Sequence, residues 1–328
     1  MTRSTRRRST PTLARAATLV AVVAMATRGA RAQGDGGSRA GLLLTLPTST
    51  RALGLGAASA AAGADEWATF FSPAQLAALR APAMGAATEA YLAGTQLTAV
   101  AFALPVGRGT LGIGATLLDY GAIDEIASPL PGGDGTETGH TYTAQDNAFV
   151  VAYGRETRGA VRLGVAAEYF GTHVADLSGS GFAASGSAAW TSRRGWDVSA
   201  AVQHAGPDVT LGATRGSLPV TARFTVAAPA RHRGAFTVRP MLEVRSVRGA
   251  GTFGAAAAEA TWQAGTGTAV TGRAGYTLAP GSDDHAPVSL GLGVALGSFT
   301  LDYAFERFRT IGQVTHRVGL RYAWRPAR

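Results

Sequence analysis

Histidine clusters are the first place to look for metal or acid–base chemistry in this chain of 328 residues. The six histidines lie at positions 140, 173, 204, 232, 285 and 316. None shows the short spacing of a metal-ligand motif. The run Asp283-Asp284-His285 is more typical of a solvated loop than of a cation site. We therefore expect loop or strand-end histidines and no metal.

Cofactor and nucleophile motifs are equally sparse. Gly54-Leu55-Gly56 looks like part of a dinucleotide-binding loop, but it lacks a preceding strand and a third glycine in register. The sequence contains no Gly-x-Ser-x-Gly, and no pair of nucleophile and base stands out. The sequence thus predicts a protein that is not an enzyme and has no cofactor.

Charged residues form the more informative set, because they share one face of the strands predicted below. Either they line a gate or polar path around a plug, or they pair with each other and with the plug backbone and fill the lumen. Similar numbers of both signs favour the second interpretation. These candidate lumen residues are Arg162, Glu168, Asp197, Arg223, Arg239, Glu243, Arg245, Asp302, Glu306, Arg317 and Arg321.

The elements that position these charges follow from an alternation of period two after Ala83. Val161, Leu163 and Val165, for example, alternate with Arg162 and Gly164. In a strand this places the large apolar side chains on one face and small or charged ones on the other. About fourteen strands are predicted, at 84–92, 96–106, 109–120, 144–156, 160–172, 181–192, 196–205, 219–228, 236–247, 252–263, 267–278, 287–296, 299–307 and 314–324.

Both a soluble β-sandwich and a transmembrane β-barrel show this alternation, and three features favour the barrel. The strands run to about ten residues, the length of a tilted membrane strand. An N-terminal export signal is present, as described below. Aromatic residues gather near strand ends, as in interfacial girdles. They are Tyr120, Tyr169, Phe170, Trp190, Trp196, Tyr276, Tyr322 and Trp324.

The predicted connections also suit a barrel, in which short turns and long loops lie at opposite ends. Short turns are expected at Gly107-Arg108, Thr157–Gly159 and Arg193–Gly195. Long loops are expected at Gly121–Thr143, His173–Ser180 and Pro280–Ala286. The sequence therefore predicts an all-β, antiparallel transmembrane barrel over residues 83–324, with a tail at 325–328.

Residues 1–32 have the pattern of a secretory signal peptide. Arg3 and Arg6–Arg8 precede an apolar stretch, Ala16–Ala26, and Ala30-Arg31-Ala32 is a small-x-small cleavage site before Gln33. The net charge of +9 comes mainly from this region, which holds seven arginines and no acid. The remaining 23 arginines nearly balance 21 acidic residues, so the sequence predicts no nucleic-acid partner.

Composition excludes two further classes. Hydrophobic residues make up 46% of the chain, yet no apolar run reaches the roughly 18 residues of a membrane helix. The chain has no cysteine, so its exported fold does not depend on disulfides.

The segment 33–82 lacks the alternation and is predicted to be a hatch that plugs the lumen. A fourteen-stranded barrel is wider than one filled by its own side chains. Ser72 is expected to cap a helix Pro73–Arg80, with Gln75 completing a capping box. Gly54 and Gly56 are expected to give a movable hatch its backbone freedom.

Six motifs in order resemble the PorV/PorQ family of outer-membrane proteins. The hatch residues 50–58 (TRALGLGAA) resemble the family's ARALGMGGA, and residues 64–76 (ADEWATFFSPAQL) resemble its ADDATALYWNPAGLA. Residues 174–184, 203–207, 301–305 and 315–320 resemble later motifs of the family. The resemblance implies a barrel similar to the long-chain fatty acid transporter FadL, with an N-terminal hatch inside. The hatch motif comprises Arg51, Gly54, Gly56, Asp65, Ser72, Pro73 and Ala74.

The chain departs from the family at two points. Ser72 stands where the family's hatch motif has asparagine, which puts the hydrogen bonds of that amide in doubt. Arg325–Arg328 follow the last aromatic residue, whereas barrel insertion signals usually end on one. We nevertheless expect Tyr322 and Trp324 to form the assembly signal.

Two functions from different classes remain. One is passive transport of hydrophobic or amphipathic small molecules across the outer membrane of a diderm bacterium. The alternative is a scaffold or shuttle of a type IX-like secretion system that binds secreted proteins. Either function implies contact with outer-membrane lipid and with the barrel assembly machinery. The gated lumen favours transport.

Overall fold

In this computed structural model the described residues are 39–58, 63, 65–127, 136–157, 160–278, 285–308 and 312–324. The predicted signal peptide 1–32 and tail 325–328 lie outside the described residues. None of the helices in the described part of the chain is long and apolar enough to cross a membrane.

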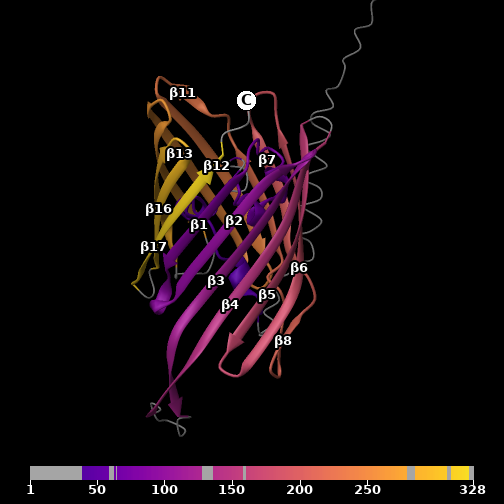
Figure 1. Cartoon of the computed structure of the whole chain (residues 1–328), viewed down its shortest axis with the longest axis vertical. Helices are drawn as coiled ribbons and strands as arrows, with labels where there is room; N and C mark the ends of the chain where they lie inside the picture. The colour runs from indigo at the N-terminus through magenta and orange to yellow at the C-terminus, as the bar shows by residue number, and fades with distance from the viewer. Residues whose placement is uncertain are drawn as a thin grey trace, which may run out of the picture.

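Fourteen long antiparallel strands form a closed ring in the described ranges (Figure 1). β1 pairs with β17 and β10 pairs with β12, so no long strand is left with a free edge. The all-β barrel and its strand number were therefore predicted correctly. The strands of the ring are β1 (Ala83–Ala90), β2 (Gln96–Val106), β3 (Gly109–Ala127), β4 (Thr136–Glu156), β5 (Val161–Val174), β6 (Leu177–Thr191), β7 (Asp197–Ala205), β10 (Thr221–Ala227), β12 (Phe236–Val247), β13 (Gly251–Gly265), β14 (Thr268–Leu278), β15 (His285–Leu296), β16 (Phe299–Phe308) and β17 (Val314–Ala323).

Shorter elements complete the structure. Before the ring come the 3₁₀ turn η1 (Leu42–Thr45) and three one-turn helices, α2 (Thr50–Gly54), α3 (Ala68–Phe71) and α4 (Pro73–Leu76). Another 3₁₀ turn, η2 (Leu92–Gly94), joins β1 to β2. The strands β8 (Val209–Leu211) and β9 (Thr214–Gly216) form a separate hairpin, and β11 (Arg231–Arg233) pairs with β12.

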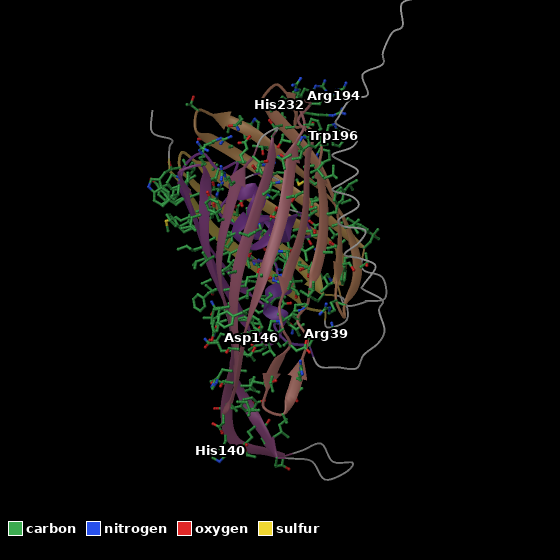
Figure 2. The ribbon with its side chains drawn as sticks, turned by 90° about the vertical axis from the view of Figure 1, so that its right-hand side faces the viewer. Arg39, His140, Asp146, Arg194, Trp196 and His232 are labelled. Carbon is green, nitrogen blue, oxygen red and sulfur yellow. The ribbon has the colours of Figure 1, made fainter. Side chains whose placement is uncertain are left out.

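The two ends of the barrel differ, as Figures 1 and 2 show. Arg194, Trp196 and His232 lie at one end, and His140 lies at the tip of the β3–β4 hairpin beyond the other end (Figure 2). Two long-loop predictions were wrong. The segment 121–143 largely extends β3 and β4 outward. His173–Ser180 is a tight hairpin, because β5 reaches Val174 and β6 begins at Leu177.

The alternation predicted from sequence sorts the side chains as expected. Leu163, Leu292 and Leu301 point outward and stay about half exposed, whereas Arg162 and Glu168 are buried inside. Such an apolar outer face suits hydrocarbon rather than water. The girdle prediction was wrong for Phe170 and Tyr120. They lie in or against a lumen cluster with Leu43, Leu97, Leu118 and Leu218.

The seam between β1 and β17 carries packed aromatic rings. The ring centroids of Tyr322 and Trp324 are 4.6 Å apart, and those of Phe299 and Tyr322 are 4.8 Å apart. The Trp324 amide donates to the Pro82 carbonyl at 3.0 Å, which ties the end of β17 to the residue before β1. An unpaired strand edge in lipid would leave backbone groups unsatisfied, at several kcal/mol each.

Trp324→Ala is expected to lower the yield of folded barrel, because it removes a ring from this seam. Deleting Arg325–Arg328 is expected to leave the yield unchanged. Heat-modifiable mobility of the protein in membrane fractions measures both. The opposite pattern would place the assembly signal in the tail.

Leu292→Arg is expected to destabilise the barrel in lipid by about 2–4 kcal/mol, the cost of arginine on the lipid face near the midplane. Leu292→Val should be tolerated. Thr271→Arg is the matched control, because Thr271 on β14 pairs with Gly293, the residue after Leu292, and lines a polar interior cavity. Urea unfolding in lipid vesicles reports the three free energies. Equal losses of stability for Leu292→Arg and Thr271→Arg would contradict the assignment of Leu292 to the lipid face and Thr271 to the lumen.

Candidate functional site

The candidate site is the lumen, and the described part of residues 39–82 contacts the wall on two sides of it. α2 packs against β15 and β16, and α4 packs against β4 and β5. These strand pairs lie on nearly opposite sides of the ring. Arg39, the first described residue, makes a parallel β-bridge to Ser217 in the long connection between β7 and β10.

Glycines on the inner wall let the hatch backbone approach closely. A Cβ on Gly164 would overlap the backbone of Pro73 and Ala74, and one on Gly275 would overlap Leu55 and Gly56. A Cβ would meet hatch backbone at Gly154, Gly164, Gly275 and Gly291, and hatch side chains at Gly85, Gly112, Gly114 and Gly319. These eight glycines lie on seven strands, and we call them the glycine belt. The hatch packs against these wall positions, which carry no side chain.

The two hatch glycines have different roles, which corrects the prediction for one of them. Gly54 lies inside α2, and a Cβ there would come within 3.0 Å of the Gly291 Cα, so Gly54 provides close approach rather than freedom. Gly56 has a φ of +58°, a left-handed conformation that glycine adopts at little cost. Its carbonyl accepts a hydrogen bond from Thr277 at 3.2 Å.

Arg51 is the strongest polar anchor of the hatch. Its guanidinium lies 2.8 Å from Glu259 on β13 and 3.1 Å from Asp65, so it joins two parts of the hatch to the wall. Burial lowers the pKa of Arg51, but the carboxylates of Glu259 and Asp65 outweigh that effect and raise it. Arg51 therefore keeps its charge, and the ion pairs hold the hatch in place.

Glu66 makes the second ionic anchor. It is fully buried and accepts from Arg321 on β17 at 2.8 Å. Burial raises the pKa of Glu66 to about 7 against the opposing effect of Arg321. This carboxyl group therefore begins to take up a proton near neutral pH.

Ser72 does not cap the following helix, so that prediction was wrong. Its hydroxyl lies 2.9 Å from the Ser199 hydroxyl on β7. The Ala74 amide instead donates to the Ser187 hydroxyl on β6 at 2.8 Å, so the barrel wall supplies the cap. Among the described residues the Gln75 side chain has no hydrogen-bond partner, so it does not form a capping box with Ser72. The α-helix ends at Leu76 rather than Arg80, because the chain continues in i→i−3 turns to Leu79.

A different serine caps a helix of the hatch. Ser49 accepts from the Ala52 amide at 2.9 Å and begins α2. The spacing Ser49-x-x-Ala52 lacks the acidic third residue of a capping box, so sequence motifs gave no signal for it.

The candidate lumen charges all lie on the inner face, and most pair with each other or with the hatch backbone. Arg162 and Arg239 both contact Asp197, at 2.6 and 3.0 Å. Arg223 donates to Glu243 at 2.7 Å and to the Ala57 carbonyl at 3.1 Å.

The remaining predicted charges lie elsewhere on the wall. Arg317 contacts Glu89 and donates to the Pro47 and Ser49 carbonyls. Asp302 contacts Arg273 at 2.5 Å. Arg245 lies 3.7 Å from Glu243. Glu306 lines the apolar cavity described below.

Sequence reasoning missed four polar residues of this lumen. Glu89, Glu259 and Arg273 lie on the predicted inner face of their strands. Their positions in the alternating pattern could therefore have identified them as lumen residues. His204 is buried, and its Nδ1 lies 2.6 Å from Glu168. A bulge between β6 and β7 turns both Gln203 and His204 inward, which alternation cannot reveal. Within the described ranges, no group of three or more histidine or acidic side chains could hold a metal.

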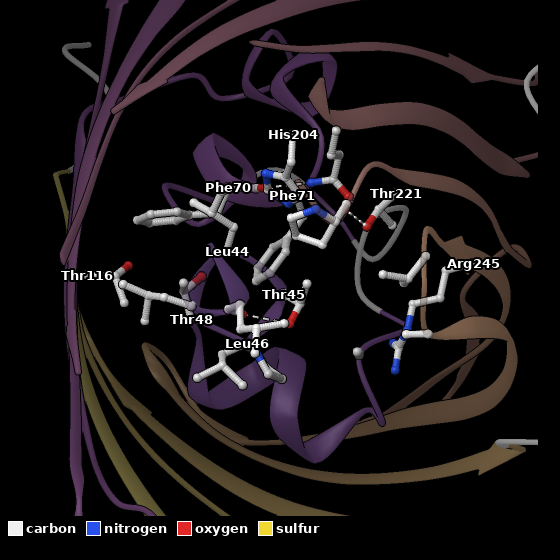
Figure 3. Close-up of a pocket in the computed structure, with 18 of the residues that line it drawn as sticks. Leu44, Thr45, Leu46, Thr48, Phe70, Phe71, Thr116, His204, Thr221 and Arg245 are labelled. Atoms are coloured by element: carbon white, nitrogen blue, oxygen red, sulfur yellow. Dashed lines mark hydrogen bonds between the residues drawn. The ribbon is translucent and has the colours of Figure 1, made fainter. Parts of the chain in front are cut away.

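Two unlike cavities lie in the lumen. One has a volume of about 270 Å³ and a mainly apolar surface, to which Leu44, Leu46, Phe70 and Phe71 contribute, although charged side chains such as Arg245 also line it (Figure 3). The other has a volume of about 370 Å³ and is lined by Arg51, Asp65, Glu259, Arg273, Asp302, Arg321 and several threonines. The first is close to the lower limit for small-molecule sites, about 300 Å³.

Solved structures of hydrocarbon transporters share this architecture. The toluene transporter TodX of Pseudomonas putida aligns with a TM-score of 0.58 and 8% identity, over 84% of this chain and 97% of its own. The chain has the fold of these transporters. The toluene transporter TbuX of Ralstonia pickettii gives 0.56 and 11%, over 84% and 98%. A FadL homologue of Pseudomonas aeruginosa gives 0.57 and 10%, over 85% and 98%. No family model and no curated protein sequence matches the chain.

Gly164→Val is expected to lower the free energy of unfolding by about 1–3 kcal/mol, as overpacking does, because it pushes Pro73 and Ala74 off the wall. Gly186→Val is the matched control. Gly186 lies beside Val165 on the adjacent strand, and a Cβ there meets nothing within 4 Å. Urea unfolding and protease digestion of the hatch compare the two. Equal effects would mean that the glycine belt does not seat the hatch.

Proposed function

We propose that this protein is an outer-membrane channel of the PorV/PorQ type that passively transports hydrophobic or amphipathic small molecules. The observation that carries the proposal is the apolar cavity inside a closed barrel, bounded by the protein's own N-terminal segment. The apolar outer face supports insertion in a bilayer. The predicted signal peptide 1–32 would direct export to the outer membrane.

The structural neighbours agree with transport. Two are described as toluene transporters and one as a FadL homologue, and each aligns over more than four fifths of this chain. Passive transport also fits the six motifs that resemble PorV/PorQ proteins, since some members of that family carry hydrophobic compounds. No contact among the described residues specifically favours the alternative role as a secretion shuttle.

The hatch must shift if a solute is to pass. Phe70 and Phe71 line the apolar cavity, and the adjacent Ser72 contacts Ser199 on the wall. Movement of this segment would open the cavity toward the polar compartment that Arg51 and Asp65 line. Local movement of a few residues costs less free energy than unfolding the barrel.

A disulfide between the hatch and the wall tests this mechanism. Ser72→Cys with Ser199→Cys places two thiols where the hydroxyls are 2.9 Å apart, in a chain with no other cysteine. Oxidation is expected to reduce uptake of the hydrophobic fluorophore N-phenylnaphthylamine to the level of cells without the protein. Dithiothreitol should restore uptake.

The matched control is a disulfide within the wall. Thr88→Cys with Thr98→Cys joins β1 to β2 on the outer face, where the hydroxyls are 3.4 Å apart, and leaves both the hatch and the lumen unchanged. It should not change uptake. Full uptake with the hatch locked would exclude passage past the hatch. Equal uptake with and without the protein, together with secreted proteins accumulating in the periplasm of a deletion strain, would support the shuttle instead.

A further inference from the structure

The apolar cavity contains polar atoms that are buried and lack partners. Glu89 is 1% exposed, and its Oε1 has no hydrogen-bond partner in the described part of the structure. The hydroxyls of Thr48 and Thr116 are likewise buried without a partner. All three residues line the cavity, and Figure 3 shows Thr48 and Thr116 on the same side of the view. An unsatisfied buried polar atom is destabilising, and more so when it is charged.

Arg317 brings two of these groups together. It binds the Oε2 of Glu89, which lies directly opposite it on the neighbouring strand. It also donates to the carbonyls of Pro47 and Ser49, the two neighbours of Thr48. The free carboxylate oxygen and the free hydroxyl therefore belong to one cluster at the wall of a cavity that is otherwise mainly apolar.

The chemistry of this cluster selects a particular kind of ligand. A carboxylate oxygen only accepts, so it needs a donor, and the threonine hydroxyl can donate in return. A ligand hydroxyl satisfies both groups, whereas a hydrocarbon leaves both unpaired. A ligand carboxylate placed at this cluster would be repelled by Glu89. Arg245 and Arg248, which also line the cavity, lie on β12 and just after it, across the ring from Glu89 on β1. Sites built to bind a hydroxyl discriminate strongly against analogues that lack it.

We propose that the apolar cavity binds hydroxylated aromatic or aliphatic molecules, whose hydroxyl donates to Glu89 and accepts from Thr48. This inference rests on the proposed transport function and specifies the substrate class. The apolar body of the ligand packs against Leu44, Leu46 and Phe71, which line the same cavity.

Three probes of similar shape test the inference. Toluene has no polar group, p-cresol adds a hydroxyl, and 4-methylanisole keeps the oxygen but cannot donate. Calorimetric titration of the full protein in lipid nanodiscs, corrected with empty nanodiscs, gives the three affinities. We expect p-cresol to bind about tenfold more tightly than either other probe, as a hydrogen bond to a charged group implies.

Thr48→Val keeps the shape of the side chain and removes only an unpartnered hydroxyl. It should weaken p-cresol binding about three- to tenfold, while toluene binding stays unchanged. Glu89→Gln should also reduce the preference for p-cresol. Thr300→Val is the matched control, because Thr300 lines the other cavity, and it should change none of the three affinities.

Each outcome has a distinct meaning. Equal binding of p-cresol and 4-methylanisole, or no effect of Thr48→Val, would overturn the hydroxyl site but leave hydrophobic transport standing. Binding of toluene in preference to p-cresol would also overturn the hydroxyl site and would identify the ligand as a hydrocarbon. If none of the probes binds, both the hydroxyl site and the cavity as a transport site fail.

Discussion

The arrangement of the barrel interior depends on one constraint, which is close contact between the backbone of the hatch and the backbone of the barrel wall. A lumen enclosed by fourteen strands is too wide for its own side chains to fill, yet ordinary side chains on the wall would keep a folded segment away. Glycine at positions such as Gly154, Gly164 and Gly275 lets α4 and the turn after α2 lie directly on the strands. The glycine belt thus determines where the hatch lies, and the cavities are the parts of the lumen that the hatch does not fill.

Buried charge is the second requirement, and it is met by pairing. An arginine transferred into the lumen without a partner would cost several kcal/mol, whereas a paired and hydrogen-bonded arginine offsets most of that cost. Arg51, Arg223 and Arg317 each join a wall carboxylate to the hatch, either through Asp65 or through backbone carbonyls. The same pairs that neutralise the lumen therefore hold the hatch in register.

The strands could be predicted from sequence because their outer face must be continuous and apolar. Two strands, Gln96–Val106 and Phe236–Val247, have the predicted bounds, and the others differ by a few residues except where β3 and β4 extend beyond the ring. The hatch followed no such rule. The Ser187 hydroxyl that caps α4 lies 113 residues away, and the Ser72 hydroxyl bonds one 127 residues away, so local motifs assigned both wrongly. The inward turn of His204 depends on a bulge that alternation conceals.

The hatch separates a more apolar compartment of the lumen from a more polar one, and this difference affects which solutes could move between them. An apolar molecule in the cavity beside Phe71 would lose favourable contacts on entering the compartment of Arg51, Glu259 and Arg273, because the lining of that compartment is more polar. A molecule with one hydroxyl loses less, because polar groups are available on both sides of the hatch. If transport runs through the lumen, the polar compartment therefore favours release of amphipathic solutes over pure hydrocarbons. An unpartnered carboxylate oxygen in the apolar cavity is consistent with that selection, since it would capture the polar end of a ligand before the hatch moves.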